Sequence, residues 1–285
     1  MDKKMKPDSL YDLSQRANIN VKSTESGQVV LYEDHRTILN VLFYLKKSKK
    51  GTFPINIILF DDHDDACKPS EEALRIIKGF NKTEPDLREF WSFTEFDLRT
   101  LDDDWIKAGM ELGLINHLFL FNASQSGISF ATKYKTMKFG EKRIYNLGYL
   151  WDSLSHRGNL YDVVKQKEYG ELWKDFGWVY DKQNGRFKFS APQAFIVDFD
   201  LDCFTTKILE KRVAIPEDIL FDKFTEHHQP GYHYFYTYQA FVKELIEEST
   251  LTTICFENGF CGGYRECFKI FDMVDQLFFD NELGK

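Results

Sequence analysis

The sequence predicts a single three-layer α/β domain, in which helices cover both faces of a mainly parallel sheet. Short apolar runs alternate with segments of helical periodicity along the 285 residues. The runs are almost continuously apolar, which is typical of strands that are buried on both faces. No internal repeat or low-complexity linker interrupts them. We therefore expect a polar lead-in at residues 1–26 and one domain at residues 27–285.

Apolar runs give the expected strands. Each has the length of an ordinary strand and is followed by polar or turn-forming residues. The expected strands are 28–32, 55–60, 115–121, 194–199 and 251–256.

Helical periodicity and end signals give the expected helices. Apolar residues recur at helical spacing in segment 37–47, which ends in lysines and is followed by Gly51. Ser70 precedes Glu71 and Glu72, a pattern that predicts the start of a helix. Three further segments are expected to be helical in whole or in part: 96–112, 145–185 and 264–279.

Composition excludes several classes of function. The net charge of −8 gives no general basic field, so neither nucleic acid nor an anionic membrane is an expected partner. No apolar run approaches the roughly 20 residues of a membrane span. The chain opens without an export signal and has five cysteines, which predicts free thiols and a cytoplasmic location.

Acidic residues and histidines follow three of the expected strands. These clusters lie at 33–35, 61–65 and 198–202. Parallel strands present their carboxyl ends at one edge of the sheet, where ligands bind in such folds. The three clusters are therefore expected to lie close together.

The spacing within the clusters predicts a common focus. On extended backbone, residues two apart point to the same side. Asp61, His63 and Asp65 can therefore converge on one point, and so can Asp200 and Asp202. Carboxylates gathered in this way repel one another strongly in a partly dry site unless a cation lies between them.

Adding His35 gives a ligand set of four carboxylates and two imidazoles. That is too many ligands for one tetrahedral zinc ion, and it suits two metal ions that share bridging carboxylates. Oxygen-rich sites with some imidazole favour Mn²⁺, with Zn²⁺, Fe²⁺ and Co²⁺ as alternatives. We therefore expect two Mn²⁺ per chain in a site that activates water.

The residues at these strand ends resemble the arginases and other ureohydrolases. That family carries Gly-Gly-Asp-His, then D-A-H-x-D, then S-x-D-x-D-x-x-D-P, in this order, on an α/β sheet that holds two manganese ions. This chain has Glu-Asp-His at 33–35, Asp-Asp-His-Asp-Asp at 61–65 and Asp-Phe-Asp-Leu-Asp at 198–202. By position, the resemblance implies His35 and Asp65 as ligands of one ion, His63 and Asp202 as ligands of the other, and Asp61 and Asp200 as bridges.

The resemblance also implies a substrate. Glu257 follows the strand at 251–256, like the family glutamate that meets the substrate guanidinium through a bidentate pair. Attack by the activated water on the guanidine carbon would release urea and an amine. Asp65 would pass on the proton, and His156 is a candidate general acid for the leaving amine.

The chain departs from the family motifs at several positions, and these departures bear on the size of the expected substrate. The paired glycines before Asp34 are absent, Asp198 stands where the family has serine, and Thr205 stands where it has the last aspartate. The family loops that grip the α-amino and α-carboxylate groups of free arginine are not found either. A site without those grips suits a guanidine within a larger molecule. The chain looks most similar to the peptide arginases of ribosomal peptide (RiPP) maturation, which convert arginine in a precursor peptide to ornithine.

Other readings of the same residues stay open. A deacetylase or a different ureohydrolase on this scaffold would also cleave a C–N bond with metal ions. A binuclear phosphoesterase would usually carry more histidine and an asparagine ligand. A non-catalytic protein that binds arginine-containing peptides, and a homo-oligomer, are likewise compatible with the sequence.

Overall fold

The computed structural model describes residues 10, 13, 18–99, 103–122, 129–148, 175, 178–181, 186–189, 194–225 and 237–284. In this part of the chain, seven α-helices accompany an eight-stranded, mainly parallel sheet, which confirms the α/β class. The strands of the main sheet are β1 (Ile19–Thr24), β2 (Gly27–Tyr32), β3 (Ile55–Asp61), β4 (Ile115–Asn122), β5 (Ser129–Lys135), β6 (Glu141–Leu147), β9 (Phe195–Asp200) and β12 (Leu251–Cys255).

The main sheet has the strand order β1-β2-β12-β9-β3-β4-β6-β5. All pairs from β2 to β6 are parallel, and only the edge strands β1 and β5 run antiparallel to their neighbours. The five expected strands are β2, β3, β4, β9 and β12, whereas β1, β5 and β6 were not predicted. Because β1 begins at Ile19, the sheet includes part of the segment expected to be a lead-in. The outer boundary of the domain stays a prediction.

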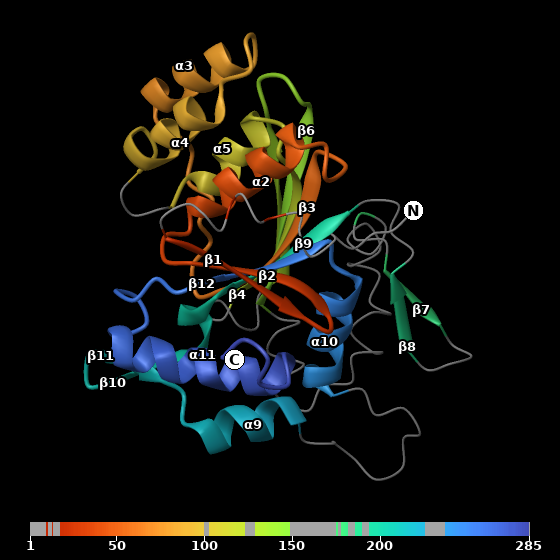
Figure 1. Cartoon of the computed structure of the whole chain (residues 1–285), viewed down its shortest axis with the longest axis vertical. Coiled ribbons are helices and arrows are strands. Elements are labelled where there is room, and N and C mark those ends of the chain that lie inside the picture. Colours follow the sequence, from red (N-terminus) through yellow and green to blue (C-terminus); the bar gives the residue numbers. More distant parts are fainter. Residues whose placement is uncertain are drawn as a thin grey trace.

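Helices cover both faces of the sheet. Figure 1 shows α2–α5 on one side of the strands and α9–α11 on the other. The helices are α2 (Thr37–Lys47), α3 (Glu71–Phe80), α4 (Leu87–Phe96), α5 (Trp105–Glu111), α9 (Glu217–Thr225), α10 (Tyr238–Glu248) and α11 (Tyr264–Phe278).

Two apolar cores follow from the three layers. Along β3, Ile57 and Leu59 pack into the core beneath α2–α5, whereas Ile58 and Phe60 pack into the core beneath α9–α11. All four side chains are buried. Each contributes about 1.5–3 kcal/mol by leaving water. This two-sided burial explains why the run at 55–60 is apolar throughout.

Smaller elements complete the described structure. Two antiparallel hairpins stand apart from the main sheet, and one short 3₁₀ helix follows β9. These elements are the hairpin β7 (Trp178–Asp181) with β8 (Arg186–Phe189), the hairpin β10 (Thr205–Ile208) with β11 (Lys211–Ala214), and η3 (Leu201–Phe204).

The helix predicted over 96–112 is present only in its second half, as α5 (Trp105–Glu111). Helix α4 ends at Phe96 and α5 begins at Trp105, and the described residues between them, 97–99 and 103–104, are not helical. The Asp104 carboxylate accepts a hydrogen bond from the backbone N–H of Arg99 at 3.3 Å. Such local side-chain bonds to the backbone compete with helix formation. By contrast, Ser70 caps α3 as expected, because its hydroxyl accepts from the N–H of Ala73 at 3.0 Å.

Among the described residues, no helix combines the length and the apolar character that crossing a membrane requires.

Candidate metal centre

The candidate site lies where four neighbouring parallel strands end. The strands β2, β12, β9 and β3 are adjacent in that order, so their carboxyl ends share one edge of the sheet. His35 follows β2, Glu257 follows β12, Asp200 ends β9 and Asp61 ends β3. The ladder between β2 and β12 continues past the strands, because the N–H of Glu257 donates to the carbonyl of Glu33 at 3.2 Å. The expected meeting of the three clusters is therefore present.

One group of ligand atoms surrounds the imidazole of His35, which is fully buried. Its Nδ1 atom lies 3.0 Å from Asp65 Oδ2, 3.4 Å from Asp200 Oδ2 and 3.9 Å from both Asp61 Oδ2 and Glu257 Oε1. Within this set, His35, Asp61 and Asp65 each offer one ligand atom within 4.8 Å of the other two, so these three residues could hold one ion.

Three buried polar atoms in this group have no hydrogen-bond partner: His35 Nδ1, Asp61 Oδ2 and Glu257 Oε1. A buried polar atom without a partner costs about 1–3 kcal/mol, so such atoms are rare in native proteins. Asp61 Oδ2 and Glu257 Oε1 each lie 3.9 Å from His35 Nδ1. A cation beside His35 Nδ1 would compensate such buried atoms, so the residues present fit a metal ion.

A second group of ligand atoms surrounds His63. Its Nδ1 atom lies 2.9 Å from Asp202 Oδ2 and 3.7 Å from Asp61 Oδ1. The His63 side chain is 39% exposed, so this group opens towards solvent, whereas Asp61 and Asp202 are fully buried. Asp61 belongs to both groups, with one oxygen towards each histidine. That is the arrangement expected of a bridging carboxylate.

Burial and like charges raise the pKa values of the acidic residues here. Burial, followed by the nearby charge of Asp65, raises the pKa of Asp61 well above its ordinary value. Burial and the charge of Asp202 raise the pKa of Asp200 to about 7. Burial and the charge of Asp200 raise the pKa of Glu257 to about 9. Carboxylates so close together resist ionisation unless a cation compensates their charge.

His35 is held from behind by Asp198. The Nε2 atom of His35 lies 2.8 Å from Asp198 Oδ2, and the other oxygen of Asp198 accepts from Tyr32 Oη at 2.9 Å and Thr253 Oγ1 at 2.6 Å. Burial lowers the pKa of His35, but the charges of Asp198 and Cys255 and hydrogen bonding to Asp198 and Asp200 together outweigh it, and the pKa is raised well above its ordinary value. A carboxylate on the far nitrogen of a metal-binding histidine fixes the ring and makes it a better ligand. The Asp198 carboxylate can act on His35 in this way.

Two further residues hold the carboxylates. Trp105, at the start of α5, donates its indole N–H to Asp65 Oδ2 at 2.8 Å. Arg212, on the β10–β11 hairpin, lies 3.3 Å from Asp202 Oδ2 and 2.8 Å from Asp62 Oδ2. Asp65 has a positive φ of 40°, a conformation that a side chain other than glycine rarely adopts without compensation.

The structure brings together the six residues that the sequence predicts to be metal ligands, and Glu257 faces the first group. The six residues are His35, Asp61, His63, Asp65, Asp200 and Asp202. Asp34 does not face the site, since it pairs with Arg36. His156 lies outside the described residues, so its role stays a prediction.

Sequence reasoning missed several contributors. Asp198 carried a usable signal, because a buried acidic residue inside an apolar strand needs a partner. Trp105 and Cys255 lie in ordinary apolar patterns, and Arg212 lies on a hairpin that the sequence did not predict. Cys255 Sγ, a ring nitrogen of His35 and a carboxylate oxygen of Glu257 lie within 4.8 Å of one another.

No protein-family model matches the chain, and no curated protein matches it.

Proposed function

We propose that this protein is a binuclear metal hydrolase that acts on arginine in a peptide. It hydrolyses the guanidine group of the side chain, which leaves ornithine in the peptide and releases urea. One observation carries the proposal: two histidines and four aspartates meet at the ends of adjacent strands and share Asp61 between two groups. The rest of the proposal relies on the position of Glu257, on the adjoining cleft and on the resemblance of the motifs to arginases.

The proposed ligand sets are His35 and Asp65 on one side and His63 and Asp202 on the other, with Asp61 and Asp200 between them. Oxygen-rich sets with imidazole favour Mn²⁺. When bound, two such ions lower the pKa of water to near 7 and hold it for attack. Asp65 lies at the edge of the first group, where it can accept the proton and pass it on.

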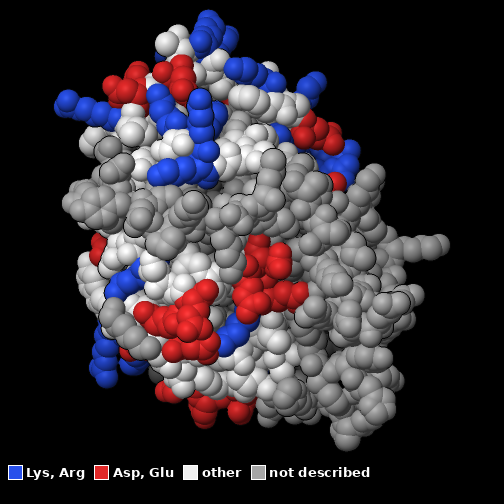
Figure 2. Space-filling view, turned by 45° about the vertical axis from the view of Figure 1, so that its right-hand side comes forward, with Lys and Arg blue, Asp and Glu red and all other residues white. Residues whose placement is uncertain are grey.

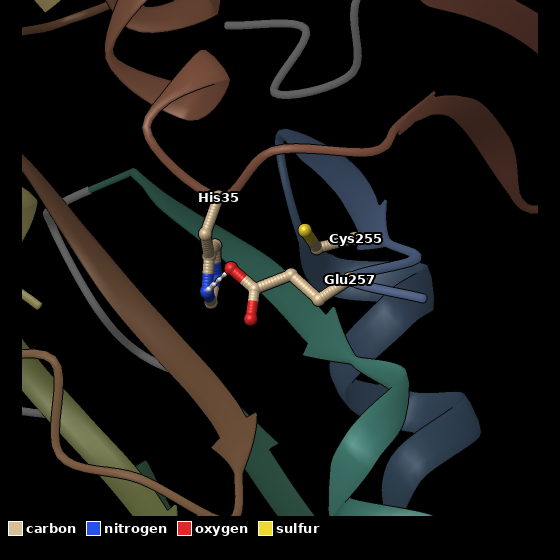
Figure 3. A group of neighbouring side chains, drawn as sticks. All are labelled: His35, Cys255 and Glu257. Atoms are coloured by element: carbon tan, nitrogen blue, oxygen red, sulfur yellow. Dashed lines mark ion pairs between the residues drawn. The ribbon is translucent and has the colours of Figure 1, made fainter. Parts of the chain in front are cut away.

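Glu257 is placed to hold the substrate. Its side chain is only 9% exposed, and Oε1 points into the first group without a hydrogen-bond partner. Figure 3 shows its carboxylate turned towards the imidazole of His35. A guanidinium would supply a positive charge to compensate this buried carboxylate and would form a bidentate pair with it. That pair would hold the guanidine carbon beside the activated water.

A cleft beside Glu257 supports a substrate larger than a free amino acid. Its volume is about 1000 Å³, at the upper end of the range for ligand pockets. Figure 2 shows acidic side chains gathered in adjacent groups on one face of the molecule, with basic side chains beside them and at its upper end, as expected of a mixed surface with a net charge of −8. The cleft is lined by acidic and aromatic residues and one arginine, among them Glu33, Glu95, Trp91, Phe96, Phe260 and Arg88.

The test is a comparison of substrates. The Mn²⁺-loaded protein is incubated with free arginine and with arginine-containing peptides, and the products are analysed by mass spectrometry and a urea assay. We expect conversion of arginine to ornithine in peptides and little conversion of the free amino acid. Release of acetate from acetyl-lysine peptides, or of phosphate from an aryl phosphate, would contradict the proposal. Peptide binding without turnover would leave a binding protein instead.

Asp200→Ala provides the matched variant. It removes a proposed bridging carboxylate, so we expect urea release from peptides to be lost. Asp64→Ala is the control and should keep its activity, because that aspartate is exposed, stands in the same 61–65 segment and belongs to neither group. Turnover that survives in Asp200→Ala would rule out the proposed mechanism.

A further inference from the structure

The last residue of β12, Cys255, points its thiol at the site. The side chain is fully buried. Its Sγ atom, a ring nitrogen of His35 and a carboxylate oxygen of Glu257 lie within 4.8 Å of one another. Figure 3 shows the three side chains grouped at the end of the strands, with Cys255 and Glu257 on one segment and His35 on another. The proposed manganese ligands do not include this sulfur.

Neither His35 Nδ1 nor Glu257 Oε1 has a hydrogen-bond partner. Their side chains are 0% and 9% exposed. Glu257 also has a positive φ of 30°, so its backbone adopts a conformation that is costly for a residue with a side chain. The surrounding structure therefore holds this carboxylate where water cannot compensate it.

We propose that His35, Cys255 and Glu257 form an alternative metal-binding site, which is selective for thiophilic divalent cations such as Zn²⁺ and Cd²⁺. One nitrogen, one sulfur and one oxygen leave a fourth position open, which is the ligand number of a catalytic or inhibitory zinc site. Thiolate selects softer ions, whereas carboxylate and imidazole without sulfur suit Mn²⁺. On binding, the thiol loses its proton to water and the sulfur forms a bond to the ion, with no change of oxidation state.

Binding of a thiophilic ion at this alternative site and binding of manganese at the proposed centre are mutually exclusive. His35 is shared with the proposed manganese set, and Glu257 is the proposed anchor of the guanidinium. This competition rests on the proposed function, whereas binding of the thiophilic ion itself does not. In excess Zn²⁺, His35 would therefore no longer be available to bind manganese, and Glu257 would no longer be available to bind the substrate.

The test is a titration of the metal-free full-length protein with Cd²⁺, followed by the sulfur-to-cadmium charge-transfer absorption. We expect the band in the wild type and its loss in Cys255→Ser, with a fall in Cd²⁺ affinity of at least about 10-fold. Cys203→Ser is the matched control, because Cys203 is also buried and next to Asp202 but belongs to none of the described metal-binding groups. That variant should keep the band.

A band that persists in Cys255→Ser would overturn the proposal and place the ion on another thiol. Glu257→Gln keeps the sulfur and the volume of the side chain, so it should keep the band but reach it only at higher Cd²⁺ concentration. If Cys255→Ser does not fold, the Cd²⁺ titration of Glu257→Gln tests the proposed site instead, and an unchanged Cd²⁺ affinity would contradict it. Mn²⁺ binding to the wild type, measured in parallel, is a separate result. A wild type that does not bind Mn²⁺ would contradict the proposed function. The cadmium band would still test the alternative site of His35, Cys255 and Glu257.

Discussion

At the scale of single residues, the site depends on carboxylates that are held by other groups. Asp198 lies behind His35 on the same strand as Asp200, two residues away, so one imidazole spans two carboxylates of β9. Tyr32 and Thr253 donate to Asp198 and leave it able to accept from His35. This hydrogen bonding sets the His35 ring with Nδ1 free to bind an ion.

Asp198→Asn tests this arrangement. The amide would keep the bonds to Tyr32 and Thr253 through its oxygen but would present N–H groups to His35 Nε2. That nitrogen would then have to accept, so the ring proton would move to Nδ1, where an ion should bind. We expect Mn²⁺ affinity to fall about 10–100-fold. Nitrogen NMR of the histidine ring would report the changed tautomer directly.

Thr253→Val is the control for Asp198→Asn. It removes one donor to Asp198 but leaves the carboxylate and its bond to His35. Its Mn²⁺ affinity should change much less, and its histidine tautomer should not change. An Asp198→Asn protein that binds Mn²⁺ as tightly as the wild type would contradict the role given to Asp198.

At the scale of elements, the β10–β11 hairpin closes one side of the site against the loop between β12 and α11. Gly262 in that loop has a φ of 90°, and a Cβ atom added there would lie 2.1 Å from the carbonyl oxygen of Arg212. The close approach of the two backbones therefore requires glycine. It also positions Arg212 to pair with Asp202.

Gly262→Ala should separate the hairpin from the loop. We expect a loss of at least about 1–3 kcal/mol of unfolding free energy from backbone strain alone. Weaker metal binding at His63 should accompany it, because Asp202 loses its neighbour. Thermal unfolding and metal titration measure both effects.

The control for Gly262→Ala is Gly259→Ala in the same loop, where an added Cβ atom meets nothing within 4 Å. That variant should stay within a few tenths of a kcal/mol of the wild type. Equal effects of the two substitutions would show that the contact with Arg212 does not matter.

The same elements show how far the sequence could predict the structure. Apolar strands followed by polar clusters predicted β2, β3, β9 and β12 and the ligands at their ends, because strand pairing in an α/β sheet brings those ends together. Trp105, Arg212 and Cys255 reach the site through tertiary contacts with segments distant in sequence, and no local pattern signals such contacts. The helix predicted over 96–112 failed where the Asp104 side chain bonds to the backbone.

At the scale of the whole molecule, the gathered carboxylates link stability to pH and to metal. In the metal-free fold the pKa of Asp200 is raised from 3.8 to about 7, and that of Glu257 from 4.5 to about 9. The folded protein therefore keeps protons that the unfolded chain releases at lower pH. This contribution to stability is complete below the unfolded pKa values and is lost as pH rises through the folded ones. The raised pKa of His35 acts in the same direction.

The chelator-treated protein should consequently unfold at a lower temperature near pH 8 than near pH 5. Metal should reverse this trend, because metal ions bind the deprotonated ligands and stabilise the fold more as pH rises. Calorimetry with and without Mn²⁺ measures both slopes. Metal-free protein that becomes more stable between those two pH values would contradict the assignment of these carboxylates.

The metal content of the loaded protein tests the central claim most directly. After incubation with Mn²⁺ and removal of unbound ions, the metal per chain is measured by plasma mass spectrometry for the wild type and for His63→Ala. The two groups of ligands predict about two ions per wild-type chain and about one in the variant, because His63 belongs to only one group. A wild-type chain that retains no metal, or a variant that retains as much as the wild type, would contradict the proposed centre.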